Sequence, residues 1–182
     1  MLSGVITSKT KINILVKLFL NPAMRAYLRE LASEFKVSTN SVRTELNNLT
    51  KNGVLVSERE GRNVYYRANT EHPLFPELSS MVRKITGIDK LAHSVIERLG
   101  NLEAVYLVGD YAEGKDSGII DIVLIGDVDK AQLEDITGKT EKYIKRRVRS
   151  LVLSPTEFKN LSTDGTFRKI LPIWQGTDSN ET

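Results

Sequence analysis

The stretch from Ser38 to Arg67 constrains this 182-residue chain most, because it predicts a helix followed at once by a two-stranded hairpin. Ser38 opens a run of hydroxyl and amide side chains that are suited to capping the start of a helix. Val42, Leu46 and Leu49 then recur at i, i+4 and i+7. One stripe of this helix is therefore expected to face a core.

The opposite face of the helix carries polar and basic side chains, with Glu45 as its acidic exception. Such side chains hydrogen-bond base edges and phosphates in the major groove of DNA. We expect six residues of this helix to contact a DNA groove: Thr39, Asn40, Ser41, Arg43, Thr44 and Asn47.

A glycine and a hairpin signal follow the helix. Gly53 can take the left-handed conformation that a helix end needs. Residues 54–57 and 64–67 are rich in β-branched and aromatic side chains, which predicts two strands, and residues 60–63 form a turn signal. Arg62 is thereby placed at the tip of the hairpin, where we expect a further contact to DNA.

This order of helix, glycine, strand, charged turn and a strand with paired tyrosines resembles the winged helix-turn-helix of ArsR-type bacterial and archaeal repressors. The resemblance covers roughly Ser8 to Asn69. It implies that the helix 39–52 enters the major groove and that the wing touches the backbone or the minor groove. A winged helix used for protein contacts is the alternative.

Charge and composition narrow the classes of function. Residues 1–88 hold 13 Lys and Arg against 7 Glu, a net +6, whereas residues 89–182 have a net charge of −3. A basic first half suits a polyanion, because neutralising phosphates releases counterions. The chain contains no cysteine, which excludes disulfides, thiolate nucleophiles and thiolate metal sites. His72 and His93 are expected to be structural, so neither a metal nor a cofactor is expected.

No segment approaches the roughly 20 apolar residues of a membrane span, and the N-terminus lacks a convincing cleavage site. A cytoplasmic protein without a membrane partner is therefore expected. Apolar periodicity predicts helices over residues 8–20 and 27–35, and either two helices or one kinked helix over 73–100, with an interruption at Gly87. The segment 73–100 is either a connector packed within one chain or, as we favour, a dimerisation element.

Strands alternate with helices in the second half, which predicts an α/β domain. Strands are expected over 103–108, 119–126 and 148–153, helices over 130–145 and from Pro155, and a strand or an edge segment at 171–174. The fold class is thus α+β and α/β, with three parts: 1–72, a winged helix domain; 73–100, the helical connector or dimerisation element; and 101–182, an α/β domain.

The last part resembles the minimal nucleotidyltransferase domain of the DNA polymerase β superfamily, over about Leu102 to Trp174. That family places Gly-Ser or Gly-Gly at a strand end and Asp-hydrophobic-Asp on the next strand. Here Gly109-Asp110 is followed, ten residues on, by Asp121-Ile122-Val123. The resemblance implies a nucleotide site with two magnesium ions held by carboxylates.

Departures from that pattern predict a vestigial site at Gly109, Asp110 and Asp121 with no catalytic residue. Val123 stands at the second carboxylate position and cannot ligate a cation, and residues 148–153 offer no third carboxylate. Asp121 is either a surviving metal ligand or, as we favour, hydrogen-bonded to the Gly109 turn. Two further alternatives stay open. The acidic residues Asp110, Glu113, Asp116 and Asp121 could form a pocket for a cation, and the basic run from Lys142 to Arg149 could be a solvated helix end, extend the DNA footprint or bind an acidic effector.

The leading hypothesis is a homodimeric DNA-binding transcriptional regulator. Double-stranded DNA is the expected partner of the winged helix, and the degenerate nucleotidyltransferase-like domain is expected to act as a sensor or interaction module for an unknown effector or protein. Two alternatives remain. One is an active nucleotidyltransferase of the antitoxin kind that is targeted by the winged helix, and the other is a protein scaffold that binds no DNA.

Overall fold

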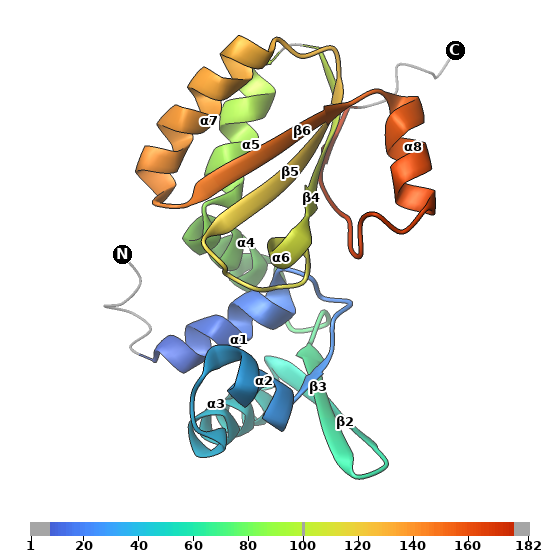
Figure 1. Cartoon of the computed structure of the whole chain (residues 1–182). Helices are drawn as coiled ribbons and strands as arrows, with labels where there is room; N and C mark the ends of the chain where they lie inside the picture. Colours follow the sequence, from blue (N-terminus) through green and yellow to red (C-terminus); the bar gives the residue numbers. More distant parts are fainter. Residues whose placement is uncertain (1–7, 100, 177–182) are drawn as a thin grey trace. The chain divides into compact units, whose positions relative to one another are not determined.

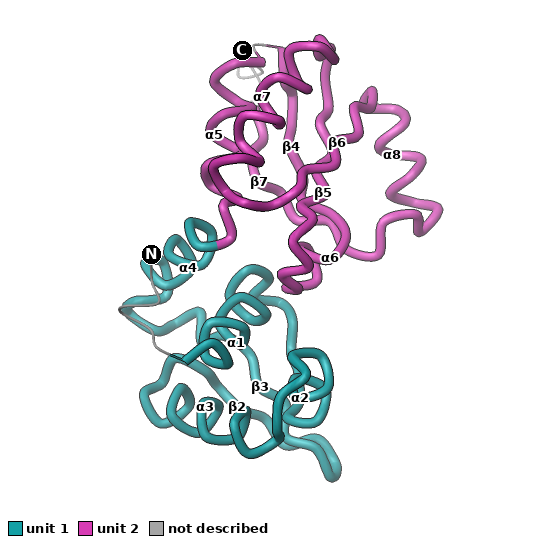
Figure 2. Tube along the Cα trace, turned by 60° about the vertical axis from the view of Figure 1, so that its left-hand side comes forward, with its two compact units in different colours: residues 1–85 teal, residues 86–182 magenta. Residues whose placement is uncertain are grey.

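The computed structural model describes residues 8–99 and 101–176, and the chain divides into two compact units at Ile85 and Thr86 (Figure 2). The first unit runs from residue 1 to 85 and the second from 86 to 182. The segment 73–100, which we expected as a separate part, is divided between them. Its first helix belongs to the N-terminal unit and its second helix to the C-terminal unit.

The N-terminal unit has the winged helix topology expected from the sequence (Figure 1). Its three-stranded antiparallel sheet has the order β1-β3-β2. The sequence did not predict the two-residue strand β1, which pairs Ala26 with Tyr66 and Tyr27 with Tyr65. The elements are α1 (Lys9–Phe19), β1 (Ala26–Tyr27), α2 (Leu28–Phe35), α3 (Thr39–Lys51), β2 (Leu55–Glu60), β3 (Asn63–Ala68) and α4 (Phe75–Thr86).

Helix α3 begins and ends where its sequence predicts. The Ser38 hydroxyl accepts a hydrogen bond from the Ser41 N–H at 3.2 Å, which satisfies one of the backbone donors left over at a helix start. Gly53 follows the helix with a φ of +70°, a conformation that glycine adopts without steric cost. Leu46 is fully buried in a core that α3 shares with α1 and α2. Burial of this stripe fixes which face of α3 points outward.

Gly87 separates α4 from α5 (Ile88–Arg98), as predicted. A Cβ atom at position 87 would lie 2.8 Å from the side chain of Ile144, so only glycine fits. In the N-terminal unit, Phe75 of α4 packs against Phe19 with tilted rings whose centroids are 5.4 Å apart, and Val82 is fully buried in the same core. The predicted end of the second helix at Gly100 lies outside the described residues.

The C-terminal unit is an α/β domain built on a four-stranded sheet with the order β6-β5-β4-β7 (Figure 1). β5 and β6 are parallel, and the other pairs are antiparallel. The open prediction at 171–174 is resolved as a strand, whereas the short helix α6 was not predicted. After α5 come β4 (Leu102–Val108), α6 (Gly109–Ala112), β5 (Ile119–Gly126), α7 (Lys130–Ile144), β6 (Arg147–Leu153), α8 (Pro155–Thr163) and β7 (Leu171–Gln175).

Alternation along the central strands assigns side chains to the two faces of this sheet. Val123 and Ile125 of β5 pack with Leu153 of β6 and with Phe158 of α8. This face, on the side of α8, is the one that Asp121 shares, because it lies two residues before Val123. Helix α7 lies against α5 in both views of the unit (Figures 1 and 2).

Candidate functional site

The N-terminal unit has a groove between α3 and the wing, with a cavity volume of about 730 Å³. Arg43 and Asn47 of α3 line it together with Arg62 of the wing tip. The structure therefore brings together three of the residues predicted to contact DNA. Arg29, in the first turn of α2, which the sequence makes available to phosphates together with Arg25, lines the same groove.

The three arginines of the groove, Arg29, Arg43 and Arg62, are exposed and form no ion pair with any residue that the structure describes. Arg25 behaves differently. Its guanidinium pairs with Glu60 at 2.6 Å and lies 4.4 Å from the centre of the Tyr65 ring. Arg25 thus ties the strand that precedes α2 to the wing.

The remaining predicted residues of α3 differ in accessibility. Thr39, Asn40 and Thr44 are exposed, and the Thr44 hydroxyl donates a hydrogen bond to the Asn40 carbonyl at 3.0 Å. Ser41 is half-buried, with its hydroxyl 3.1 Å from that of Thr10 on α1. Ser41 therefore joins two helices, a role that its position in the sequence did not reveal.

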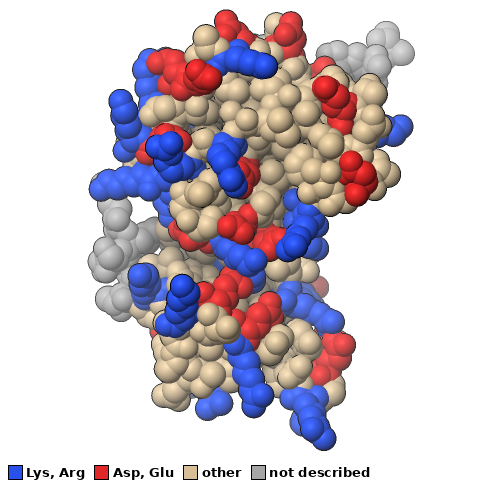
Figure 3. All heavy atoms as spheres, viewed as in Figure 1, with Lys and Arg blue, Asp and Glu red and all other residues tan. Residues whose placement is uncertain are grey.

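Glu45, the acidic residue of α3, is directed toward α1 and does not line the groove. Glu45 pairs with Lys11 of α1 at 3.3 Å, and its side chain is largely buried. In the view of Figure 1, Lys and Arg side chains lie along the lower margin of the N-terminal unit, over α2, α3 and the wing tip (Figure 3). No helix among the described residues is long and apolar enough to cross a membrane.

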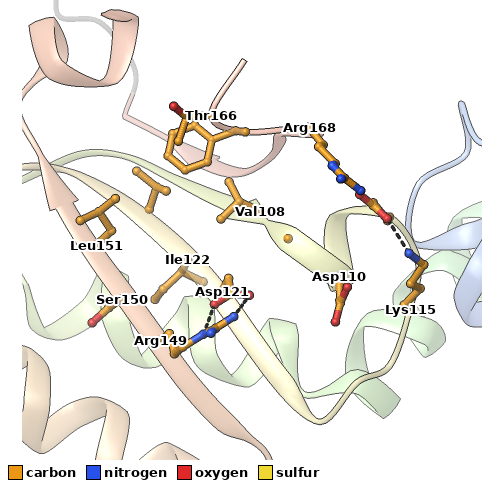
Figure 4. Close-up of a pocket in the computed structure, with 14 residues that line it drawn as sticks. Val108, Asp110, Lys115, Asp121, Ile122, Arg149, Ser150, Leu151, Thr166 and Arg168 are labelled. Atoms are coloured by element: carbon orange, nitrogen blue, oxygen red, sulfur yellow. Dashed lines mark hydrogen bonds and ion pairs between the residues drawn. The ribbon is translucent and has the colours of Figure 1, made fainter. Parts of the chain in front are cut away.

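The C-terminal unit has a pocket of about 460 Å³ at the start of α6 (Figure 4). Its apolar part is formed by Val108, Val123, Leu151 and Phe167, from three strands and the loop after α8. Its charged residues balance, with three acidic and three basic side chains: Asp110, Glu113, Asp121, Lys115, Arg149 and Arg168. The expected vestigial residues Gly109, Asp110 and Asp121 all line this one pocket.

Asp121 is held by an arginine of the neighbouring strand. Arg149 donates from Nε to Oδ1 at 2.5 Å and from an Nη to Oδ2 at 2.8 Å (Figure 4). Gly109 approaches from the other side with a φ of +63°, and a Cβ atom there would lie 2.6 Å from Oδ2. Neither of the two roles considered for Asp121 from the sequence, a metal ligand or an acceptor from the Gly109 turn, included this ion pair.

Three of the four acidic residues considered for a cation pocket line the same pocket, but most of the four are already paired with basic side chains. Glu113 pairs with Lys115 at 2.7 Å, and Asp116 pairs with Arg146 at 2.5 Å. Asp116 does not line the pocket. The basic run is engaged in the same way, because Arg146, Arg147 and Arg149 each form an ion pair with a carboxylate.

A network of polar side chains around Tyr111 fixes the loop between α6 and β5, and no pattern in the sequence indicates it. Tyr111 is fully buried, and its hydroxyl donates to Asp116 and accepts from Arg146 Nε at 2.7 Å. Burial and the bonded Asp116 carboxylate raise the pKa of Tyr111. Burial alone would raise the pKa of Asp116, but hydrogen bonds from Arg146 and Tyr111 outweigh it and lower that pKa.

The pocket does not fit the two magnesium ions that the resemblance implies. Val123, at the position of the second carboxylate, is fully buried among apolar side chains. Within residues 8–99 and 101–176, no group of three or more His, Cys, Asp or Glu side chains could hold a metal ion. Asp121, the one carboxylate left at the motif positions, is already paired with Arg149 at 2.5 Å, whereas a two-metal site needs carboxylates that hold both ions.

Comparison with known proteins gives one family match. A family model described as PaaX-like protein matches residues 21–71, the stretch that contains β1, α2, α3 and the wing. No curated protein matches the chain.

Several solved structures are similar at low sequence identity. Reduced HlyU from Vibrio cholerae N16961 is 18% identical, with a TM-score of 0.38, over 48% of this chain and 83% of that one. A Sulfolobus solfataricus protein, provisionally described as a nucleotidyltransferase, is 20% identical with a TM-score of 0.38, over 56% and 88%. The transcriptional regulator BldR from Sulfolobus solfataricus is 14% identical with a TM-score of 0.37, over 55% and 69%. These values assign no activity or partner.

Proposed function

We propose that this chain is a transcriptional regulator whose N-terminal unit binds double-stranded DNA. The observation that carries the proposal is the groove between α3 and the wing, which is lined by Arg29, Arg43 and Arg62 without a carboxylate partner among the described residues. Unpaired guanidinium groups bind phosphates at little internal cost, because no ion pair has to be broken first. Asn47 lies among them and can read the edge of an adenine.

The match to a PaaX-like family model over residues 21–71 agrees with this proposal, since it covers the helices and the wing that form the groove. In the arrangement we propose, α3 enters the major groove and the wing follows the backbone or the minor groove. The narrower resemblance to ArsR-type repressors remains a prediction of the sequence.

DNA-binding measurements on a triple variant test the proposal. Arg29→Ala/Arg43→Ala/Arg62→Ala should weaken binding to any duplex and flatten the salt dependence by roughly 0.9 in the log–log slope per lost phosphate contact. Arg67→Ala is the control, because Arg67 is exposed on β3 of the wing and does not line the groove. Equal affinities of the triple variant and the control would reject the groove as the DNA site.

For the C-terminal unit we propose a nucleotidyltransferase-like domain without catalytic activity that serves as a sensor or an interaction module. The pairing of Asp121 with Arg149 and the apolar Val123 support this role. Its pocket of about 460 Å³ has the size and the mixed apolar and charged lining of small-molecule sites. An effector bound there is expected to change the affinity of the full chain for DNA, which a titration can measure.

We further propose that the regulator acts as a homodimer on paired half-sites about one helical turn apart, roughly 34 Å. The apolar face of α5 does not provide the dimer surface, because Leu91, Ala92 and Val95 are already buried within the chain. Sedimentation equilibrium of the full chain, with and without a DNA duplex that carries two half-sites, measures the stoichiometry. A single copy on such a duplex would reject the dimer.

An active nucleotidyltransferase is the second candidate, because Gly109 and Asp121 line one pocket in the arrangement that the resemblance implies. This reading predicts pyrophosphate release from labelled ATP or CTP with magnesium, and loss of that release in Asp121→Asn. Turnover that depends on Asp121 would replace the non-catalytic assignment of the C-terminal unit.

A further inference from the structure

We propose that the guanidinium of Arg149 takes the place of a divalent cation beside Asp121, so that the pocket of the C-terminal unit is a metal-free site. This inference rests on the proposed absence of catalysis in that unit, and it names the group that fills the cation's position.

Strand register places Arg149 beside Asp121. In the parallel pair of β5 and β6, Asp121 is the registered partner of Arg149, and Val123 is the partner of Leu151. Side chains alternate along a strand, so Asp121 and Val123 point to one face, and so do Arg149 and Leu151. All four line the pocket. The register of the two parallel strands therefore places the Arg149 side chain next to the Asp121 carboxylate.

The fork of Arg149 uses both oxygens of Asp121. Its two donor atoms lie 2.5 Å and 2.8 Å from Oδ1 and Oδ2, the geometry of a bidentate guanidinium–carboxylate pair. A cation bound by both oxygens would occupy the same side of the carboxylate. The close approach of Gly109 restricts access to Oδ2 from another side.

The described residues around Asp121 do not form a group of three or more ligands that would hold a cation in place of the arginine. The Asp121 side chain is 17% exposed and the Arg149 side chain 69%, so the arginine could swing into solvent. A cation that replaced it would have Asp121 as its ligand and Asp110 as the other unpaired carboxylate among the described residues of the pocket, since Val123 and Leu151 are apolar and Glu113 is paired with Lys115. The pocket as a whole, with three acidic and three basic residues, does not concentrate cations.

Manganese binding to the full chain tests the inference directly. The loss of the free Mn²⁺ electron paramagnetic resonance signal would be titrated for the wild type, Arg149→Gln and Arg149→Asp. We expect no Asp121-dependent binding in the wild type, and at least about tenfold tighter binding in Arg149→Asp, which offers two carboxylates in register. Arg149→Gln should fall between them. Adding Asp121→Asn to either variant should abolish the gain.

Lys159→Asp is the matched control, because it makes the same charge change in the same unit without placing the new carboxylate beside another one. Lys159 of α8 is exposed and does not line the pocket. It should leave Mn²⁺ binding at the wild-type level. Stoichiometric wild-type binding that Asp121→Asn abolishes would overturn the inference, and so would Arg149 variants that bind no better than Lys159→Asp.

DNA affinity in the absence of divalent ions separates this inference from the proposed function. Loss of Arg149 should leave DNA binding unchanged, since Arg149 is not part of the groove. A wild-type chain that fails to bind DNA would reject the regulator and leave the manganese result standing. Conversely, Asp121-dependent manganese binding by the wild type would reject the proposal that Arg149 replaces a cation, and the proposal that the chain binds DNA would be unaffected.

Discussion

Basic side chains of the two units differ in what they contact. In the groove of the N-terminal unit, Arg29, Arg43 and Arg62 form no ion pair among the described residues, whereas in the C-terminal unit Lys115, Arg146 and Arg149 are each held by a carboxylate within 3 Å. An unpaired cation on a surface is available to an external anion. A paired cation instead stabilises the position of its own partner and must lose it before binding another.

The largest expected effect comes from removing the groove side chains that we propose to contact DNA bases. Arg43→Ala/Asn47→Ala should weaken binding to a specific site by about 2–6 kcal/mol, since each base contact contributes roughly 1–3 kcal/mol. The site would be a genomic fragment retained by the purified protein. A gel-shift titration measures the affinity, and an unaltered value would remove these two residues from the interface.

Removing an ion pair of the C-terminal unit should lower the stability of the fold and leave the affinity for DNA unchanged. Asp116→Asn removes the anion between Tyr111 and Arg146, whose side chain is 18% exposed, and should lower the free energy of unfolding by about 1–3 kcal/mol after allowance for partial exposure. Urea denaturation measures this. Asp135→Asn, in the exposed pair with Lys139, is the control and should change stability by less than about 0.5 kcal/mol.

Acid should weaken the same network. The pKa of Asp116 is lower in the folded chain than in the unfolded one, so its contribution to stability is present above the unfolded value of about 3.9. That contribution is lost as the pH falls through the lowered folded value. Denaturation curves of the wild type and Asp116→Asn should therefore converge as the solution becomes more acidic. A stability difference that is independent of pH would show that Asp116 acts through packing.

The smallest expected effect is the difference between two neighbouring arginines, one of which forms an ion pair while the other does not. Arg25 is paired with Glu60 on the surface, and Arg29 lies unpaired in the groove. Arg25→Ala should cost about 0–1 kcal/mol of stability and leave the DNA salt slope unchanged, whereas Arg29→Ala should lower that slope. Anisotropy titrations at several salt concentrations compare them. Equal slopes would mean that ion pairing does not decide which arginine binds DNA.

Much of the fold could be predicted from the sequence, because apolar periodicity, caps and glycines are local signals. Ser38, Gly53 and Gly87 marked boundaries that the structure confirms. The groove residues Arg43 and Arg62 could also be named, since they lie outside the apolar stripe of a helix and at a hairpin tip.

The ion pairs and hydrogen bonds within each candidate site could not be predicted from local sequence signals. Asp121 and Arg149 are 28 residues apart, and Asp116 and Arg146 are 30 apart, so their pairing depends on strand register and on a loop conformation. Ser41 was predicted to contact DNA, and its hydroxyl also lies 3.1 Å from that of Thr10 on α1, a contact that the sequence did not indicate. Such pairings follow from tertiary structure, which a periodic pattern does not encode.

Salt dependence of binding to duplex DNA tests the central claim most directly. For the wild-type chain, the logarithm of the binding constant should fall linearly with the logarithm of salt concentration, with a slope of about −2.7 or steeper if three arginines neutralise phosphates at roughly 0.9 each. A slope near zero, or no binding to duplex DNA at low salt, would contradict the assignment of the groove to a polyanion.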